Sequence, residues 1–322
     1  MSQTEYSQNL LDHCIAETEA SGRLPDYRGK VRDVYNLPDD QMAIVVTDRI
    51  SAFDHIFPEA IPFKGQLLNL IAWHNFKAIQ PVCPHHVLDV PHPNVTIARR
   101  CDPLPVEVVV RGYLAGHAWR VYEQGGRTLC AKKLPEGLRR NETLPEPMIT
   151  PTTKATRGHD EDISEDEIIS ERLVHPDRWE EIRRVSLSLF DQGTEMAAQK
   201  GLILVDTKYE FGISNNELVL IDEVHTPDSS RYFYADEYEK RLAEDAHQKQ
   251  LSKEFLREWL IENGHHENLD NQLPRLPDDL RISIYERYRE LYEKLTGTSF
   301  EPTPAPGFNA FLADLLAWYD RK

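Results

Sequence analysis

Three ionisable side chains alternate along one apolar run, at a spacing that could hold a metal and phosphate groups. Asp206, Lys208 and Glu210 lie within LILVDTKYEF, and Asp222 ends a second run, LVLID. In a strand, alternate side chains share one face. A lysine and two carboxylates could then hold ATP phosphates and magnesium, which prefers such oxygen ligands. A solvent-facing ladder of charges on an edge hairpin is the competing interpretation of this pattern taken alone.

Convergence of Glu210 and Asp222 on one cation sets a condition on the hairpin between them. The two residues must lie opposite each other, which requires a hairpin centred on Asn216 and therefore an odd-numbered loop. An Asn in the left-handed conformation would suit such a loop. We therefore expect strands at 202–211 and 218–222, joined through SNNE.

Two further stretches combine glycine with cations. In RGKVRDVY, Gly29 precedes an expected strand and could cover phosphates as kinase glycine-rich loops do. A solvated turn is the alternative there. In VEVVVRGYLAGHAW, a buried strand ends at Arg111 before a small-residue turn, which could present amides and a guanidinium to a phosphate. Gly116 could equally mark a simple bend, and an isolated His117 is more often a surface or core histidine.

A fourth stretch, TPTTKATRGHDED, holds hydroxyls, one lysine and a carboxylate cluster. It falls in residues 136–162, which are rich in proline, threonine and charge, and we expect a long ordered loop with a binding role. His85, His86 and His92 lie close together in sequence but lack a second ligand cluster, so we do not predict a zinc site.

The elements that must position these residues follow from periodicity and punctuation. Strands precede helices without strict alternation, which favours an α+β fold over a doubly wound sheet. The expected strands, besides the hairpin, cover 31–37, 42–47, 95–98 and 106–111. The expected helices cover 6–20, 66–80, two pieces of 164–200 split before Pro176, and then 236–247, 252–263, 277–296 and 307–320.

Composition excludes several classes of protein. Among 322 residues, 37 Lys and Arg face 54 Asp and Glu, a net charge of -17 that argues against a nucleic-acid binder. A local cationic pocket for a small anion remains compatible with it. No apolar run approaches the ~20 residues that span a bilayer, and the N-terminus lacks a secretion signal, so we predict a cytoplasmic protein without membrane partners. The four cysteines form no CxxC pair, which indicates reduced thiols in packing roles.

Taken together, the motifs resemble the SAICAR synthetase (phosphoribosylaminoimidazole-succinocarboxamide synthase) family. The resemblance runs from about residue 27 to 260 in the family's order, and the bland interpretations of single motifs lose most of their weight when all occur together. The matching segments are RGKVRDVY, TDRISAFDHIFPEAIPFKGQLLN, VEVVVRGYLAGHAW, TPTTKATRGHDEDIS, DTKYEFG, IDEVHTPDSSRY and LSKEFLREWL.

The resemblance implies a two-lobed α+β fold related in its nucleotide lobe to kinases and ATP-grasp enzymes. Residues 1–112 would form a β-rich lobe covering ATP, and 113–322 a lobe with the metal, ribonucleotide and aspartate sites and C-terminal helices. The implied activity is ATP- and Mg²⁺-dependent condensation of L-aspartate with carboxyaminoimidazole ribonucleotide, through an acyl phosphate, in de novo purine biosynthesis. Its partners would be small molecules, and monomer or homodimer is left open.

The resemblance also implies roles for individual residues. Those expected to be catalytic are Lys208, Asp222 and Arg231. Those expected on ATP are Gly29, Lys30, Arg32, Glu107, Lys208, Glu210 and Asp222, with Glu210 and Asp222 binding magnesium. Those expected on the substrates are Arg111, Gly116, His117, Lys154, Asp160, Ser230, Arg231, Lys253 and Arg257. The family commonly has serine at the position of His117, and we expect the imidazole to contact the substrate in its place.

Two other functions were weighed against the ligase. A small-molecule kinase, for example one acting on inositol phosphates, would share the nucleotide lobe, but the Arg111 turn and Ser230-Arg231 favour the ligase. A degenerate nucleotide-binding or scaffolding protein is disfavoured because Lys208, Glu210 and Asp222 are all present. We therefore expect an enzyme.

Overall fold

A computed structural model describes residues 9–53, 55–154, 161–265 and 273–321 of the chain, which divides into two compact units. The first unit comprises residues 1–74, 86–100 and 253–322, and the second comprises 75–85 and 101–252. This division does not follow the expected boundary at residue 112. The strand that contains Glu107 falls in the second unit, and the C-terminal helices fall in the first.

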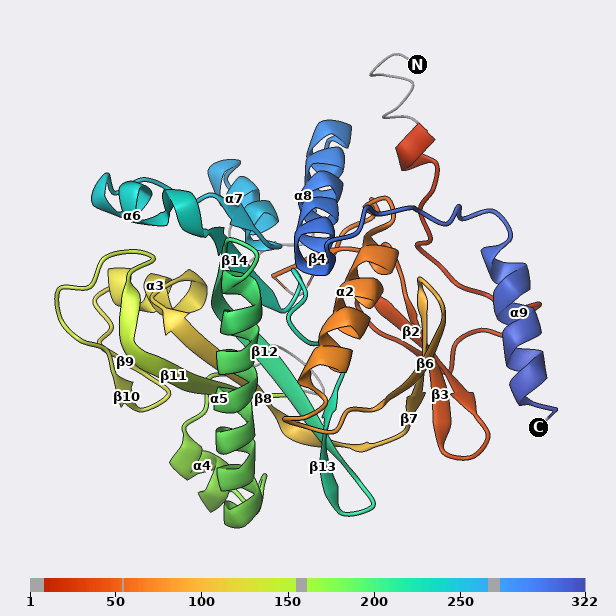
Figure 1. The fold of residues 1–322 in the computed structure, drawn as a ribbon, viewed down its shortest axis with the longest axis horizontal. Helices are drawn as coiled ribbons and strands as arrows, with labels where there is room; N and C mark the ends of the chain where they lie inside the picture. The colour runs from red at the N-terminus through yellow and green to blue at the C-terminus, as the bar shows by residue number, and fades with distance from the viewer. Residues whose placement is uncertain (1–8, 54, 155–160, 266–272, 322) are drawn as a thin grey trace. The chain divides into compact units, whose positions relative to one another are not determined.

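The first unit contains a five-stranded antiparallel sheet in the order β1-β2-β3-β7-β6 (Figure 1). Alternation along β3 divides its side chains between two cores. Ala43 and Val45 belong to the cluster that includes Leu312 of the C-terminal helix α9, whereas Val46 belongs to the cluster of α2 and α8. The bounds are β1 (Tyr27–Arg28), β2 (Arg32–Leu37), β3 (Gln41–Val46), β6 (Val87–His92), β7 (Val95–Arg99) and α9 (Phe308–Tyr319).

Helices from distant parts of the sequence share the second of these cores. Leu67 of α2, Leu256 of α7 and Ile284 of α8 are all buried there, so the C-terminal residues complete a core begun by the N-terminal ones. Gly297 ends α8 in the left-handed conformation, with φ of 73°. The bounds are α2 (Lys64–Ile79), α7 (Glu254–Glu262), α8 (Asp278–Thr296) and the short strands β4 (Ser51–Ala52) and β5 (His55–Ile56).

The segment after residue 11 is not helical, so the expected helix over 6–20 is wrong in its described part. The backbone of Ile15 is instead used in tertiary hydrogen bonds. Its N–H donates to Asp48 Oδ2 at 2.6 Å, and its carbonyl accepts from the Asp48 N–H at 2.8 Å. A helix would have consumed those backbone groups internally, and these buried contacts override a local helical pattern.

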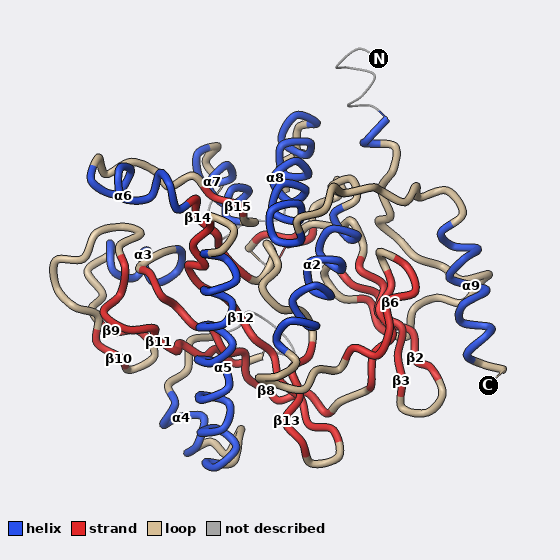
Figure 2. The backbone as a smooth tube through the Cα atoms, in the orientation of Figure 1, coloured by secondary structure: helices blue, strands red, loops and turns tan. Residues whose placement is uncertain are grey.

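The second unit is built on a six-stranded sheet in the order β11-β8-β12-β14-β15, with β13 pairing the far part of β12. Helix α5 packs on one face of β12, as Figures 1 and 2 show. Gly112 allows a close approach, since an added Cβ would lie 3.1 Å from Phe190 of that helix. The strand bounds are β8 (Asp102–Tyr113), β11 (Thr143–Thr153), β12 (Leu202–Ser214), β13 (Glu217–Ile221), β14 (Ser230–Tyr234) and β15 (Gln250–Leu251).

Strand β11 lies within the expected long loop of 136–162, so that expectation is wrong for this part. Its prolines obscured the strand: the pairing with β8 is interrupted between Thr143 and Met148, around Pro145 and Pro147. Because β11 is at the end of the sheet order, proline there costs few ladder hydrogen bonds.

The helices of the second unit follow the expected pattern more closely. The break before Pro176 is present, and this proline lies in the first turn of α5. The helix has no carbonyl partner for an N–H at that position, so the missing N–H of proline costs no hydrogen bond. Ser164 and Glu167 form a capping box at α4. The bounds are α3 (Gly116–Glu123), α4 (Glu165–Ser170), α5 (Pro176–Ala198) and α6 (Ala235–Ala243), with a hairpin of β9 (Thr128–Leu129) and β10 (Lys132–Lys133). None of the helices in the described part of the chain has the length and apolar character needed to cross a membrane.

A buried histidine anchors the loop that leads from β13 to β14. Tyr209 Oη and His225 Nε2 lie 2.7 Å apart, and Tyr232 donates to the His225 carbonyl at 2.9 Å. On α5, a Cβ added at Gly193 would lie 2.4 Å from His225 Cε1, so glycine makes room for the ring. Burial lowers the pKa of His225 to about 3, so the imidazole is neutral at physiological pH and shares one hydrogen bond with the Tyr209 hydroxyl.

This neutral histidine should make stability fall in acid. The unfolded chain binds a proton near pH 6.5, while the folded chain resists it down to about 3. The contribution is therefore full above pH 6.5, and about 2 kcal/mol of it is lost between pH 7 and 5. The glutamine of His225→Gln cannot titrate. The difference in unfolding free energy between wild type and this variant, measured by urea titration, should therefore be about 2 kcal/mol smaller at pH 5 than at pH 7. The control variant His247→Gln, at an exposed position, should lose as much unfolding free energy between pH 7 and 5 as wild type does. An equal loss in His225→Gln and wild type would contradict the assignment.

Candidate functional site

One face of the second unit's sheet carries two charged clusters in register across its strands. On β8 and β12, Glu107 lies opposite Glu210 and Arg111 lies opposite Asp206; on β14, Arg231 lies opposite Asp206 as well. Cross-strand partners share a face. The charged side chains therefore lie on one face of β12. Tyr209, which alternates with them along the strand, lies on the other face, toward α5.

The first group, the lysine–carboxylate cluster, consists of Glu107, Lys154, Lys208 and Glu210. Lys208 Nζ donates to Glu107 Oε1 and to Glu210 Oε1, each at 2.7 Å. Lys154 donates to the other Glu210 oxygen, Oε2. The Glu210 side chain is only 9% exposed, so two lysines compensate one nearly buried carboxylate.

The cluster holds its members in their charged forms. Burial opposes ionisation of Glu210, but Lys208 and Lys154 outweigh it and hold the pKa of that carboxyl well below its usual range. Burial likewise opposes the charge on Lys208, and the Glu210 and Glu107 carboxylates outweigh it, so the pKa of Lys208 is raised well above its usual value. At neutral pH the lysine is a fixed cation.

The hairpin that follows Glu210 differs from the expected one. Ser214 pairs with Glu217, leaving a two-residue turn, and the expected odd-numbered loop is wrong. Asn215 and Asn216 both adopt left-handed backbone, with φ of 50° and 63°. Two consecutive residues with positive φ are the signature of a type I′ turn, whose twist matches that of the strands it joins. The asparagine pair was the available signal for it.

This register places Ile221, and not Asp222, opposite Glu210. A regular strand would send the next side chain to the other face. Asp222 instead has φ of 66° just after β13 ends. Its charge acts on Lys154 and on Lys208, raising the pKa of both. The aspartate therefore lies near the lysine–carboxylate cluster through a backbone reversal, not through strand register.

The second group, the arginine cluster, consists of Arg111, Thr150, Asp206 and Arg231. Arg111 Nε donates to Thr150 Oγ1 at 2.8 Å, and its Nη1 lies 3.4 Å from Asp206 Oδ2. Arg231 Nη1 binds the same carboxylate oxygen. Burial lowers the pKa of Arg111, but a guanidinium stays protonated at any physiological pH. Two guanidinium groups gathered around one carboxylate oxygen are an arrangement that suits an anionic ligand.

The turn before α3 is shaped around this cluster. Gly116 has φ of 54°, and a Cβ there would lie 2.1 Å from Arg231 Nη2, so the guanidinium packs directly over the glycine. The next residue, His117, places Nε2 2.8 Å from Asp162 Oδ2. That hydrogen bond lowers the pKa of Asp162. Ser230 is buried and donates to Thr207 at 2.8 Å.

The other expected residues that the structure describes belong to the first unit. Gly29 donates its N–H to the Arg32 carbonyl at 2.7 Å across the turn between β1 and β2, and Lys30 is exposed at that turn. Lys253 lies at the start of α7, and Arg257 on that helix pairs with Glu254 at 2.8 Å. Asp160 lies outside the described residues. The structure thus gathers Glu107, Lys154, Lys208 and Glu210 in one cluster, and Arg111, Gly116 and Arg231 about the other.

Three residues in or beside these clusters were not among the expected site residues. Asp206 was visible in the alternation with Lys208 but had no assigned role. Thr150 lies in the threonine-rich stretch, and only the pairing of β11 with β8, which sets it opposite Val109, brings its hydroxyl within reach of Arg111. Asp162 was one carboxylate of a cluster, with no signal to single it out.

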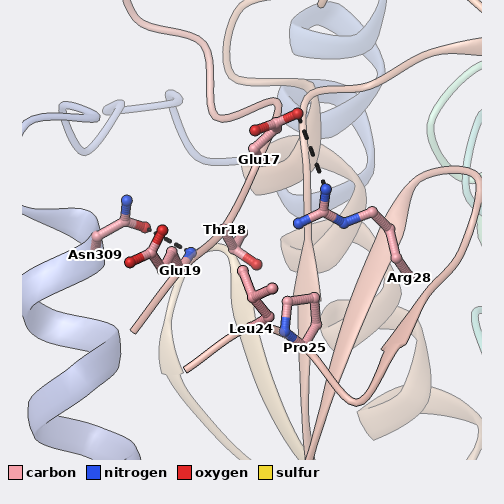
Figure 3. A pocket seen from close by; sticks show the side chains of 7 residues that line it. All are labelled: Glu17, Thr18, Glu19, Leu24, Pro25, Arg28 and Asn309. Carbon is pink, nitrogen blue, oxygen red and sulfur yellow. Dashed lines mark hydrogen bonds and ion pairs between the residues drawn. The ribbon is translucent and has the colours of Figure 1, made fainter. Parts of the chain in front are cut away.

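A cavity of about 350 Å³ lies elsewhere in the first unit (Figure 3). Arg28 and Glu17, 3.9 Å apart, face each other across part of it, and Asn309 of α9 contributes to its wall. Its lining is Glu17, Thr18, Glu19, Leu24, Pro25, Arg28 and Asn309. None of these is an expected ligand of ATP or substrate.

The donor set around Glu210 and Asp222 fits magnesium. Magnesium in nucleotide enzymes takes one or two carboxylates and completes its shell with water and phosphate oxygens. Among the described residues no group of three or more His, Cys, Asp or Glu side chains could hold a metal on its own. A pair of carboxylates beside two lysines matches a metal that arrives with phosphates.

Comparisons of the sequence and of the fold with known proteins point to one family. A family model described as SAICAR synthetase matches residues 26–275. A phosphoribosylaminoimidazole-succinocarboxamide synthase of Bacteroides thetaiotaomicron is 52% identical over 280 residues, 87% of this chain and 89% of that protein. The Saccharomyces cerevisiae SAICAR synthase complexed with SAICAR is 34% identical, with a TM-score of 0.76 over 89% of this chain and 100% of that one. A SAICAR synthetase in complex with ADP is 25% identical, with a TM-score of 0.66 over 86% and 99%.

These similarities cover most of the chain and establish both its fold and its reaction. The predicted α+β class is confirmed, with antiparallel sheets and C-terminal helices. The activity is that of phosphoribosylaminoimidazole-succinocarboxamide synthase, a ligase of de novo purine biosynthesis. The chain belongs to the SAICAR synthetase family.

Proposed function

We propose that the charged face of β12 carries out the ligation, with ATP and magnesium at the lysine–carboxylate cluster and carboxyaminoimidazole ribonucleotide at the arginine cluster. The supporting observation is the register of the sheet. Asp206 and Glu210 lie on the same strand face, four residues apart with Lys208 between them, so both clusters adjoin along one strand. A phosphoryl donor and its acceptor would then meet above neighbouring side chains.

The reaction takes two displacements. An oxygen of the imidazole carboxylate attacks the γ-phosphorus of ATP, forming a C–O–P linkage and releasing ADP. The amine of L-aspartate then attacks the acyl carbon; the C–N bond forms, phosphate leaves and the nitrogen loses a proton. Every reactant is an anion, so catalysis consists chiefly of positioning and charge compensation, without a covalent enzyme nucleophile.

Lys208 supplies a fixed positive charge for the transferred phosphoryl group. The carboxylates beside it raise its pKa, and it is protonated at neutral pH. Lys154, with 39% of its side chain exposed, is the more movable partner of Glu210. Its departure toward a substrate carboxylate would leave Glu210, with Asp222, to hold magnesium. Bound there, the metal supplies Lewis-acid compensation of phosphate charge.

The arginine cluster takes an anionic group of the ribonucleotide. Arg111 is oriented by Thr150 and Asp206, and Arg231 by Asp206, so both guanidinium groups are preorganised. The SAICAR complex of the yeast relative and the ADP complex of another relative support a ribonucleotide and a nucleotide as ligands here. We assign further contacts with the reactants to Gly29, Lys30, Arg32, Glu107, His117, Asp160, Ser230, Lys253 and Arg257.

Omission of single reactants tests the proposal. With ATP, magnesium, L-aspartate and carboxyaminoimidazole ribonucleotide all present, ADP and succinocarboxamide product should form in equal amounts, followed by a coupled ADP assay and product absorbance. Each omission should abolish product. ADP release that needs a hydroxyl compound in place of aspartate would instead identify a small-molecule kinase.

Loss of the paired carboxylates should impair the metal-dependent step. We expect Asp222→Asn and Glu210→Gln each to lower kcat by about 10² or more, because charge compensation of the transferred group is lost. Magnesium titrations should show a raised half-saturation concentration for both. Glu217→Gln changes an exposed carboxylate on the same hairpin and should leave both quantities unchanged. Wild-type magnesium dependence in Asp222→Asn would remove that residue from the site.

Two glycines offer a matched test of the arginine cluster. Gly116 and Gly125 both have positive φ, so alanine strains either position by about 1–2 kcal/mol. Only at Gly116 would the new Cβ meet Arg231, whereas nothing lies within 4 Å at Gly125. We expect Gly116→Ala to raise the ribonucleotide KM about tenfold or more and Gly125→Ala to leave it unchanged, at similar stability in thermal unfolding. Equal KM values would show that Arg231 is not positioned by this turn.

A further inference from the structure

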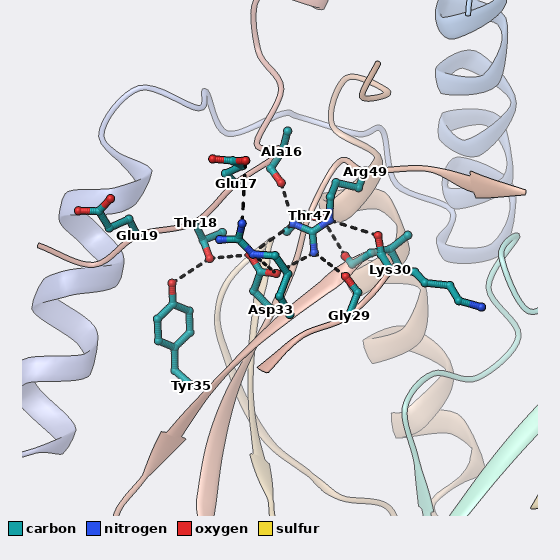
Figure 4. Close-up of polar contacts among 12 residues, drawn as sticks. Ala16, Glu17, Thr18, Glu19, Gly29, Lys30, Asp33, Tyr35, Thr47 and Arg49 are labelled. Carbon is teal, nitrogen blue, oxygen red and sulfur yellow. Dashed lines mark hydrogen bonds and ion pairs between the residues drawn. The ribbon is translucent and has the colours of Figure 1, made fainter. Parts of the chain in front are cut away.

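A buried arginine in the first unit contacts the backbone of the turn between β1 and β2. Arg49 Nη2 donates to the Gly29 carbonyl at 3.1 Å, and its Nε donates to the Lys30 carbonyl at 3.2 Å. Thr47 donates to the next carbonyl, that of Val31, from its N–H at 2.9 Å and its hydroxyl at 2.8 Å. Three successive carbonyls of the turn are therefore held from one side by residues 47–49 (Figure 4).

This anchoring decides which way the amides of the turn point. Every described peptide is trans, and in a trans peptide the N–H points opposite to the carbonyl of the preceding residue. The N–H groups of Lys30, Val31 and Arg32 therefore project away from the Arg49 and Thr47 donors. Successive amides aimed to one side form the concave arrangement that binds anions. The Lys30 side chain also extends away from Arg49 in Figure 4.

The hydrogen-bond donors of Arg49 are all engaged by the protein itself, so the side chain does not act directly on a ligand. Its side chain is 10% exposed, and Nη2 lies 2.7 Å from Oδ1 of Asp33, a carboxylate with no exposure. Thr18 donates to Oδ2 of the same carboxylate at 2.7 Å, and Tyr35 lies 2.8 Å from the Thr18 hydroxyl. Arg49 Nη1 also donates to the Ala16 carbonyl at 2.6 Å. Arg49 therefore contributes to the site by fixing the geometry of the turn.

We infer that Arg49 is a positioning residue for the nucleotide phosphates, holding the turn at Gly29–Val31 with its amides directed toward them. This inference rests on the proposed function, in which that turn contacts ATP. A planar guanidinium reaches two turn carbonyls, Ala16 and the Asp33 carboxylate together. The single nitrogen of a lysine cannot occupy all those directions at once. Arg49→Lys therefore keeps the charge and loses the anchoring of the turn.

The test compares Arg49→Lys with a matched variant, Arg281→Lys. Arg281 is also a nearly buried arginine of the first unit, 12% exposed, and donates to a backbone carbonyl, that of Ala60, at 2.9 Å. We expect Arg49→Lys to raise the KM for ATP and the dissociation constant of Mg-ADP by tenfold or more, with the aspartate and ribonucleotide KM values unchanged. Arg281→Lys should lose comparable thermal stability without either nucleotide effect. Hydrogen exchange should speed up in the peptide covering 26–33 in Arg49→Lys alone.

The outcomes separate this inference from the proposed function. Wild-type enzyme that fails to bind Mg-ADP would contradict the proposed nucleotide site, and the inference would fall with it. Wild-type enzyme that binds Mg-ADP, alongside an Arg49→Lys variant with unchanged nucleotide affinity, would overturn the positioning role alone. An equal loss of nucleotide affinity in Arg49→Lys and Arg281→Lys would also overturn it, since it would indicate a general effect of destabilising the first unit.

Discussion

The balance of charge on one face of β12 is the constraint around which the second unit is arranged. The strand buries its other face under α5, where Tyr209 packs, and this fixes the orientation of every alternate residue. The carboxylates of Asp206 and Glu210 on the first face are nearly buried as well, and an uncompensated charge there would cost several kcal/mol. Each one is therefore paired: Lys208 with Glu107 on the neighbouring strand and with Glu210 on its own strand, and Asp206 with arginines of the two strands beside it. Such pairing holds the cationic side chains in fixed positions. Flexible surface lysines would have to be ordered when the ligand binds.

These pairs depend on the register of the sheet and on the bend that follows β13. Asn215 and Asn216 set the hairpin, and with it the position of Ile221 opposite Glu210. The reversal at Asp222 then departs from the strand at the one place where a carboxylate is needed near the lysines. Left-handed backbone at a non-glycine residue costs about a kcal/mol or more and persists where the surroundings enforce it.

Much of this arrangement could be predicted from the sequence, because strand alternation alone brings Asp206, Lys208 and Glu210 to one face. The break before Pro176 was equally legible, since proline has one favourable place in a helix. Other features depend on contacts that leave no local pattern. The segment around Ile15 was mistaken for a helix because its partner, Asp48, is distant in sequence. The anchoring role of Arg49 is expressed through backbone carbonyls, which any residue could supply, so no motif identifies them.

The first unit is discontinuous in the chain, and this has a consequence for its synthesis on the ribosome. Leu67 is translated early, but its core partners Leu256 and Ile284 emerge only after the whole of residues 101–252 has been made. The sheet of the first unit likewise waits for Leu312 of α9 to cover one face. The second unit can thus complete its own sheet during translation, while the half-finished N-terminal sheet exposes apolar surface. Premature termination before α9 would leave a chain whose second unit is complete, while one face of the first unit's sheet would lack Leu312 and remain uncovered.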